Sequence, residues 1–68
     1  MSKKEIGRMR TVIAYLADKG IITTSKAAEL LAVGDKTAQR LLSRGEEIDI
    51  LTSEGENKGR IYKLKTFK

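Results

Sequence analysis

The feature that most constrains this chain is the stretch from Ile22 to Arg44, because its apolar residues recur at helical spacing on both sides of a short break. The break is Ala32-Val33-Gly34-Asp35, which is too short to be a free linker. The stretch therefore predicts two short helices joined by a tight turn.

The first of these helices is expected from Ser25 to Ala32. Thr24 is its predicted N-cap, because a threonine hydroxyl accepts a hydrogen bond from the free N–H groups of a first turn. Gly34 is expected to supply the positive φ of a sharp turn, and Asp35 to cap the second helix.

The second helix is expected over residues 35–47, and its phase can be worked out at about 100° per residue. Leu41, Leu42 and Gly45 then fall on the same side as Ala38, which predicts the buried face. Arginine and lysine bind guanine edges and phosphates, and glutamine pairs with adenine, so the opposite face has the chemistry of major-groove reading. An ordinary solvated helix surface is the alternative. The residues of this polar face are Lys36, Gln39, Arg40 and Ser43, flanked by Thr37 and Arg44.

The remaining sequence completes a single domain over residues 1–68, of which 1–4 are expected to be disordered. Residues 4–19 have the periodicity of an amphipathic helix that ends at Gly20. Residues 21–23 suit a short strand, and residues 51–65 suit a β-hairpin with its turn at 54–59. The expected core comprises Ile13, Leu16, Leu30, Leu31, Leu41 and Leu42.

The amino-acid composition favours some classes of function and excludes others. The net charge of +5 and pI near 9.8 suggest a polyanionic partner. The chain has no cysteine and no histidine, so we expect no metal site, no cofactor and no catalytic constellation. It also has no apolar run long enough for a signal peptide or a membrane span, so we expect a cytoplasmic protein.

The sequence resembles the winged helix-turn-helix domains of bacterial and archaeal transcriptional regulators, including the deoxyribose-repressor type. It departs from them at Gly34, where a capping serine is usual, at Gly45, where a core leucine is usual, and at Asp49, where a glycine commonly ends the helix. The residues that carry the resemblance are Ile22-Thr23-Thr24, Ala27-Ala28-Glu29-Leu30-Leu31, Val33, Thr37-Ala38-Gln39-Arg40 and Leu42.

The resemblance implies an α+β fold: a small winged helix-turn-helix with three helices plus a short antiparallel β-hairpin wing. It also implies sequence-specific binding of double-stranded DNA, with helix 35–47 in the major groove and wing 51–65 on the backbone. Lys36, Gln39 and Arg40 are then the expected base readers, and Thr37, Ser43 and Arg44 lie nearer the backbone. The other expected DNA contacts are Thr24, Ser25 and Lys26 at the start of the preceding helix, and Lys58 and Arg60 on the wing.

A different class of function stays open, because winged helices also act as protein-interaction or adaptor modules of larger proteins. An acidic block interrupts the otherwise basic chain, and we expect it to be a solvated face that aids solubility. The functional alternative is that the block faces away from nucleic acid or meets another protein, and acidic residues at the wing would repel phosphate. A homodimer or a larger parent protein is compatible with either function. The residues of the block are Glu46, Glu47, Asp49 and Glu54, and Glu56 adds a second charge to the wing.

Overall fold

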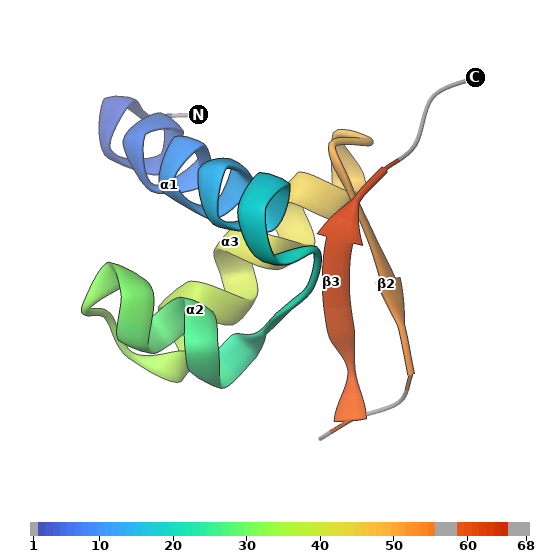
Figure 1. Cartoon of the computed structure of the whole chain (residues 1–68). Helices are drawn as coiled ribbons and strands as arrows, with labels where there is room; N and C mark the ends of the chain where they lie inside the picture. The colour runs from blue at the N-terminus through green and yellow to red at the C-terminus, as the bar shows by residue number, and fades with distance from the viewer. Residues whose placement is uncertain (1, 56–58, 66–68) are drawn as a thin grey trace.

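The computed structural model describes residues 2–55 and 59–65. Three helices pack beside a small antiparallel sheet (Figure 1), which confirms the predicted winged helix-turn-helix class. The elements are α1 (Lys3–Lys19), β1 (Ile22–Thr23), α2 (Thr24–Leu31), α3 (Asp35–Glu47), β2 (Leu51–Glu54) and β3 (Ile61–Leu64).

Helix α1 begins earlier than the sequence predicts. Ser2 caps it, because the Ser2 hydroxyl accepts a hydrogen bond from the Glu5 backbone N–H at 3.2 Å and the Glu5 carboxylate accepts one from the Ser2 N–H at 3.3 Å. This reciprocal capping box satisfies two backbone donors that would otherwise lack a partner. Residues 2–4, for which we predict disorder, are instead ordered by it. Gly20 ends the helix with φ of 92°, as expected.

The turn between α2 and α3 differs from the prediction in detail. Thr23, not Thr24, is the N-cap of α2, and its hydroxyl accepts a hydrogen bond from the Lys26 N–H at 3.1 Å. The positive φ falls on Ala32, at 56°, whereas Gly34 has an ordinary φ of −72°. The left-handed conformation costs a non-glycine residue about 1–2 kcal/mol. Backbone hydrogen bonds from Ala32 and Val33 to the end of α2 offset that cost.

The predicted cap of α3 is also wrong. Gly34 occupies the N-cap position and contributes no side-chain hydrogen bond, while Asp35 is the first helical residue. An acidic residue in the first turn still interacts favourably with the positive end of the helix dipole. At the other end, Asp49 adopts φ of 62°, a left-handed conformation that glycine adopts most readily.

The sheet has the strand order β1-β3-β2, and all its pairings are antiparallel. Tyr62 in the central strand lies opposite Ile22 on one side and Ser53 on the other. Alternate residues of a strand point to opposite faces, and residues directly opposite each other on neighbouring strands point to the same face. These three side chains therefore share the face of the sheet that meets the helices. The strand predicted near residue 22 therefore anchors the hairpin to the start of α2.

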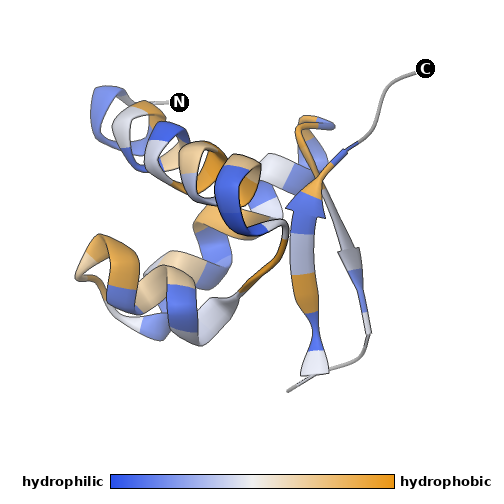
Figure 2. Ribbon diagram, viewed as in Figure 1, coloured by the Kyte–Doolittle hydropathy of each residue, from blue (hydrophilic) through white to orange (hydrophobic). Residues whose placement is uncertain are grey.

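The core joins all these elements, and Tyr62 is completely buried in it. The predicted core is confirmed for Leu16, Leu41 and Leu42, whereas Ile13 and Leu31 are only partly buried at its edge. The prediction that Leu30 belongs to the core is wrong, because this side chain is 36% exposed. In Figure 2 the C-terminal end of α2 is coloured as hydrophobic although it lies at the margin of the molecule. The core residues are Met9, Val12, Leu16, Ile22, Ala27, Ala28, Ala38, Leu41, Leu42, Leu51 and Tyr62.

The exposure of Leu30 follows from the phase of α2. Ala27 and Ala28 face the core, so the centre of the buried face lies between them. At about 100° per residue, Leu31 lies near that centre and Leu30 lies well to one side. Two small residues thus decide which face of α2 is buried, and the larger leucine at position 30 is displaced toward solvent.

Candidate nucleic-acid interface

The exposed face of α3 carries two cations, Lys36 and Arg40, which lie one helical turn apart. Within residues 2–55 and 59–65, neither side chain forms an ion pair. Ser43 follows on the same side and is exposed. The face predicted from sequence is therefore present, with two positive charges that the described part of the protein leaves unneutralised.

Gln39 has a different environment from its neighbours on α3. Its Oε1 accepts a hydrogen bond from the Thr24 hydroxyl at 2.8 Å, and its Nε2 donates to the Tyr62 hydroxyl at 2.8 Å and to the Ser43 hydroxyl at 3.0 Å. The amide thus joins the start of α2, the middle of α3 and the central strand. Pairing with an adenine edge would require these bonds to be broken, so the geometry favours a positioning role for Gln39.

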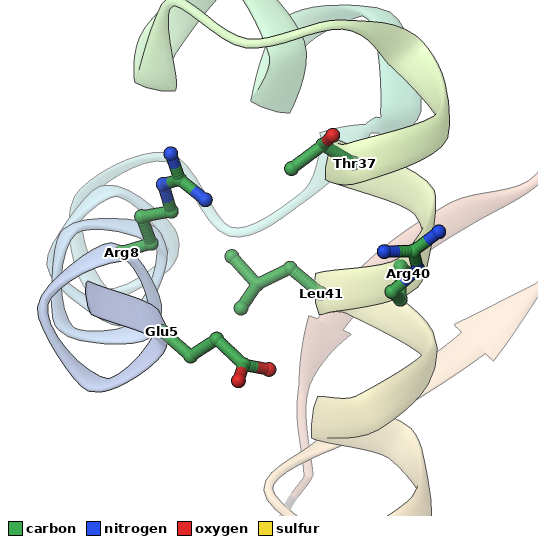
Figure 3. A pocket seen from close by; sticks show the side chains of 5 residues that line it. All are labelled: Glu5, Arg8, Thr37, Arg40 and Leu41. Atoms are coloured by element: carbon green, nitrogen blue, oxygen red, sulfur yellow. The ribbon is translucent and has the colours of Figure 1, made fainter. Parts of the chain in front are cut away.

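The two remaining residues of the polar face lie toward α1. Arg44 is exposed but forms an ion pair with Glu47 at 3.6 Å, which offsets part of its charge. Thr37 is partly buried, and its methyl group, not its hydroxyl, points toward Arg8 of α1 in Figure 3. The exposed face of α3 is therefore basic at its N-terminal end and mixed in charge at its C-terminal end.

The start of α2 supplies fewer free groups than the sequence suggests. The Thr24 hydroxyl donates a hydrogen bond to the Gln39 side-chain oxygen, and Lys26 forms an ion pair with Glu29 at 3.6 Å. Ser25 is exposed. Because Thr23 is the cap, the free backbone N–H groups of this helix begin one residue earlier than predicted.

On the wing, Arg60 is exposed and forms no ion pair among the described residues, whereas Lys58 lies outside those residues. Much of the acidic block is engaged within the molecule. Glu54 pairs with Lys63, and Asp49 pairs with Lys65 at 3.0 Å. The Glu46 carboxylate accepts a hydrogen bond from the Ser53 hydroxyl at 2.6 Å. These contacts hold the carboxylates to the hairpin and weaken the argument that they repel a polyanion.

A hollow of about 240 Å³ lies between α1 and α3, and the sequence does not predict it. Glu5 and Arg8 point into it from α1, and Thr37 and Leu41 point into it from α3, with Arg40 at its edge (Figure 3). A second hollow continues along α3 past Ser43 and Arg44. The available sequence signal was the helical phase of α1, which puts Arg8 beside its buried stripe.

Glu5 is the acidic member of this region. The hydrogen bond from the Ser2 backbone N–H lowers the pKa of Glu5, while partial desolvation acts in the opposite direction. The Ser2 hydroxyl and the positive charge of Arg44 lower the pKa further. The carboxylate is thus ionised at neutral pH, and its first role is to cap α1.

The described residues contain no group of side chains that could hold a metal ion. In the same part of the chain, no helix is both long and apolar enough to cross a membrane.

No family model and no curated protein matches the sequence. Among solved structures, the chain is similar to the Zalpha domain from Carassius auratus PKZ, whose crystal structure is in complex with Z-DNA. The two chains share 18% sequence identity, with a TM-score of 0.79 over 88% of this chain and 95% of that chain. At this identity the likeness concerns the fold, which is the winged helix; it does not single out the deoxyribose-repressor type.

Proposed function

We propose that this chain binds double-stranded DNA through the exposed face of α3 and the wing, and that it is a binding module rather than an enzyme. The observation that carries the proposal is the pair Lys36 and Arg40, which are exposed and without ion pairs among the described residues on the second helix of a helix-turn-helix unit. Arg60 adds a further exposed cation on the wing. The net charge of +5 and the DNA-bound winged helix of similar fold also support it.

The finer proposal is transcriptional regulation in a prokaryote, with α3 in the major groove. Lys36 and Arg40 are then the base readers, because arginine and lysine bind guanine O6 and N7. A regulator of this kind would act in the cytoplasm, together with the chromosome. Gln39 is the weaker candidate, since its amide already has three partners within the domain.

The engagement of Gln39 also favours a second candidate, recognition of duplex shape. With that amide occupied, α3 offers cations and hydroxyls, which contact phosphates as readily as bases. A protein that reads the path of the phosphates could select a left-handed duplex, as the similar Zalpha domain is seen to bind. The two candidates differ in whether the base sequence or the form of the helix decides affinity.

The experiment is an anisotropy titration of two duplexes of equal length across a series of salt concentrations. One is of mixed sequence, and the other is an alternating CG duplex held in the left-handed form by base modification and checked by circular dichroism. If α3 reads the phosphates, so that Lys36, Arg40 and Arg60 each meet one, log K should fall against log salt with a slope of about −2.7. Equal affinity for both duplexes would refute shape selection. No binding to either at low salt would refute the DNA function and favour the adaptor class.

A randomised-site selection then tests base reading. Arg40→Ala should flatten the sequence preference at one base pair, because losing a bidentate arginine–guanine contact costs about 1–3 kcal/mol. Lys19→Ala removes an exposed charge from the far end of α1 and is the matched control, expected to leave the selected site unchanged. An Arg40→Ala protein that selects the parental site with lower affinity would limit Arg40 to a phosphate contact.

A further inference from the structure

The hollow between α1 and α3 brings together groups from two helices that the proposed interface does not yet use. Arg8 points from α1 toward Thr37 of α3, and Arg40 lies at the edge of the same hollow (Figure 3). The Arg8 guanidinium lies in this hollow, and rotation about the Cα–Cβ bond of Thr37 would turn its hydroxyl, which does not face Arg8 in Figure 3, toward the same space. An oxyanion would accept hydrogen bonds from both.

The surroundings leave these donors available. Within residues 2–55 and 59–65, Arg8 forms no ion pair and the Thr37 hydroxyl forms no hydrogen bond. Arg44 in the adjoining hollow is already paired with Glu47, so its charge is offset locally. Glu5 is the one acidic side chain among the residues that line the first hollow, and its carboxylate is bound to Ser2.

We propose that Arg8 and Thr37, beside the base-reading Arg40, form a phosphate-binding site that extends the duplex contact from α3 onto α1. This site rests on the proposed DNA function, because its ligand is a phosphodiester of the duplex whose groove α3 enters. Arg40 lines both the first and the second hollow and so connects the proposed site to the exposed face of α3. The neighbouring Lys4, exposed and one helical turn before Arg8, continues the positive charge along α1.

The test compares two arginines of the same helix. Arg8→Ala should weaken duplex binding and reduce the salt slope by about one unit, the effect expected for loss of one phosphate contact. Arg10→Ala is the matched control: Arg10 is exposed on α1 about 200° around the helix from Arg8, and its removal should leave the slope unchanged. Equal effects of the two substitutions would show that only net charge matters and would overturn the proposal.

Glu5→Gln tests the same site by gain of affinity. Glutamine keeps the capping box, so the start of α1 is preserved while the negative charge beside Arg8 is removed. The variant should bind the duplex more tightly than the parent at low salt, and the difference should shrink as salt rises. Unchanged or weaker binding by a folded Glu5→Gln protein would refute the phosphate site, even if Arg8→Ala fails to fold.

The two proposals fail in different ways. A parent chain that does not bind at low salt overturns both of them. A parent that binds, loses affinity on Lys36→Ala and is unaffected by Arg8→Ala and Glu5→Gln keeps the DNA function and loses only the site on α1.

Discussion

The clearest physical prediction concerns two glycines that lie in helices but have opposite surroundings. Gly7 in α1 is exposed, and a Cβ built on it meets nothing within 4 Å. Gly45 in α3 is buried, and a Cβ built there would lie 2.6 Å from Leu51 Cδ1 and 3.0 Å from Met9 Cε. The same substitution, glycine to alanine, should therefore stabilise the protein at one position and not at the other.

The magnitudes follow from two opposing terms. Alanine is favoured over glycine in a helix interior by about 0.8–1.0 kcal/mol, and this gain applies to both sites. At Gly45 the new methyl group would overlap Leu51 by about 1 Å relative to the usual carbon–carbon contact of about 3.5–4.0 Å. Overpacking of this kind costs about 1–3 kcal/mol. Because the helix term cancels, the two variants should differ by about 1–3 kcal/mol in the free energy of unfolding.

Thermal and urea unfolding followed by circular dichroism measures the difference. For a domain of this size, 1 kcal/mol corresponds to a shift of about 4–8 °C in the melting midpoint. Gly7→Ala should melt above the parent, and Gly45→Ala should melt at least about 4 °C below Gly7→Ala. Adding Leu51→Val to Gly45→Ala should cost less than the sum of the single effects, because the smaller side chain removes part of the overlap. Equal stabilisation by both alanines would refute the packing described for α3.

Three further outcomes test the core, the Gln39 network and the cap. Leu42→Ala should cost about 2–5 kcal/mol, whereas Leu30→Ala, at a side chain 36% exposed, should cost clearly less; urea denaturation compares them. Tyr62→Phe removes one partner of Gln39 and should cost about 0.5–1.5 kcal/mol without changing the fold, as judged by chemical shifts. Because the pKa of Glu5 is lowered in the folded state, its contribution to stability is complete above its ordinary value of 4.5. That contribution should be lost as pH falls through the folded pKa, and Glu5→Gln should remove this part of the acid dependence in a pH series of melts.

The helices were predictable because their signals are local. Periodicity placed α3 at residues 35–47 and assigned Ala38, Leu41 and Leu42 to its buried face, as observed. The capping box of α1 was also readable, since Ser2 and Glu5 have the spacing of a serine cap with glutamate at the third helical position. The prediction of disorder over residues 1–4 did not take this cap into account.

The errors at the α2–α3 turn have a different origin. A glycine is the usual source of positive φ, yet Ala32 adopts it, because the end of α2 and not the residue type decides where the chain reverses. Gly34 is used instead as a cap without a side chain. Sequence preferences rank the residues that fit a turn but do not fix its register, which depends on how the two helices pack.

The site was harder to predict, since its arrangement depends on contacts between elements distant in sequence. The exposed cations Lys36 and Arg40 follow from the phase of one helix. The hydrogen bonds of Gln39 to Thr24 and Tyr62 depend on how α2 and the sheet lie against α3, which no local pattern contains. Arg8 was missed for the same reason, because it gains significance only when α1 lies beside α3.

Hydrogen bonds between α3 and the hairpin hold the proposed interface in place before DNA binds. Tyr62 is fully buried in the strand that carries the wing, and its hydroxyl is tied to the Gln39 amide in the middle of α3. Ser53 in the other hairpin strand is tied to Glu46, the next-to-last residue of α3. The base of the wing is therefore fixed to the helix at two points before any duplex is bound. Less ordering is then needed on binding, which favours affinity by reducing its entropic cost. Gln39→Ala should accordingly weaken duplex binding while leaving the salt slope unchanged, because it loosens the wing without removing a charge.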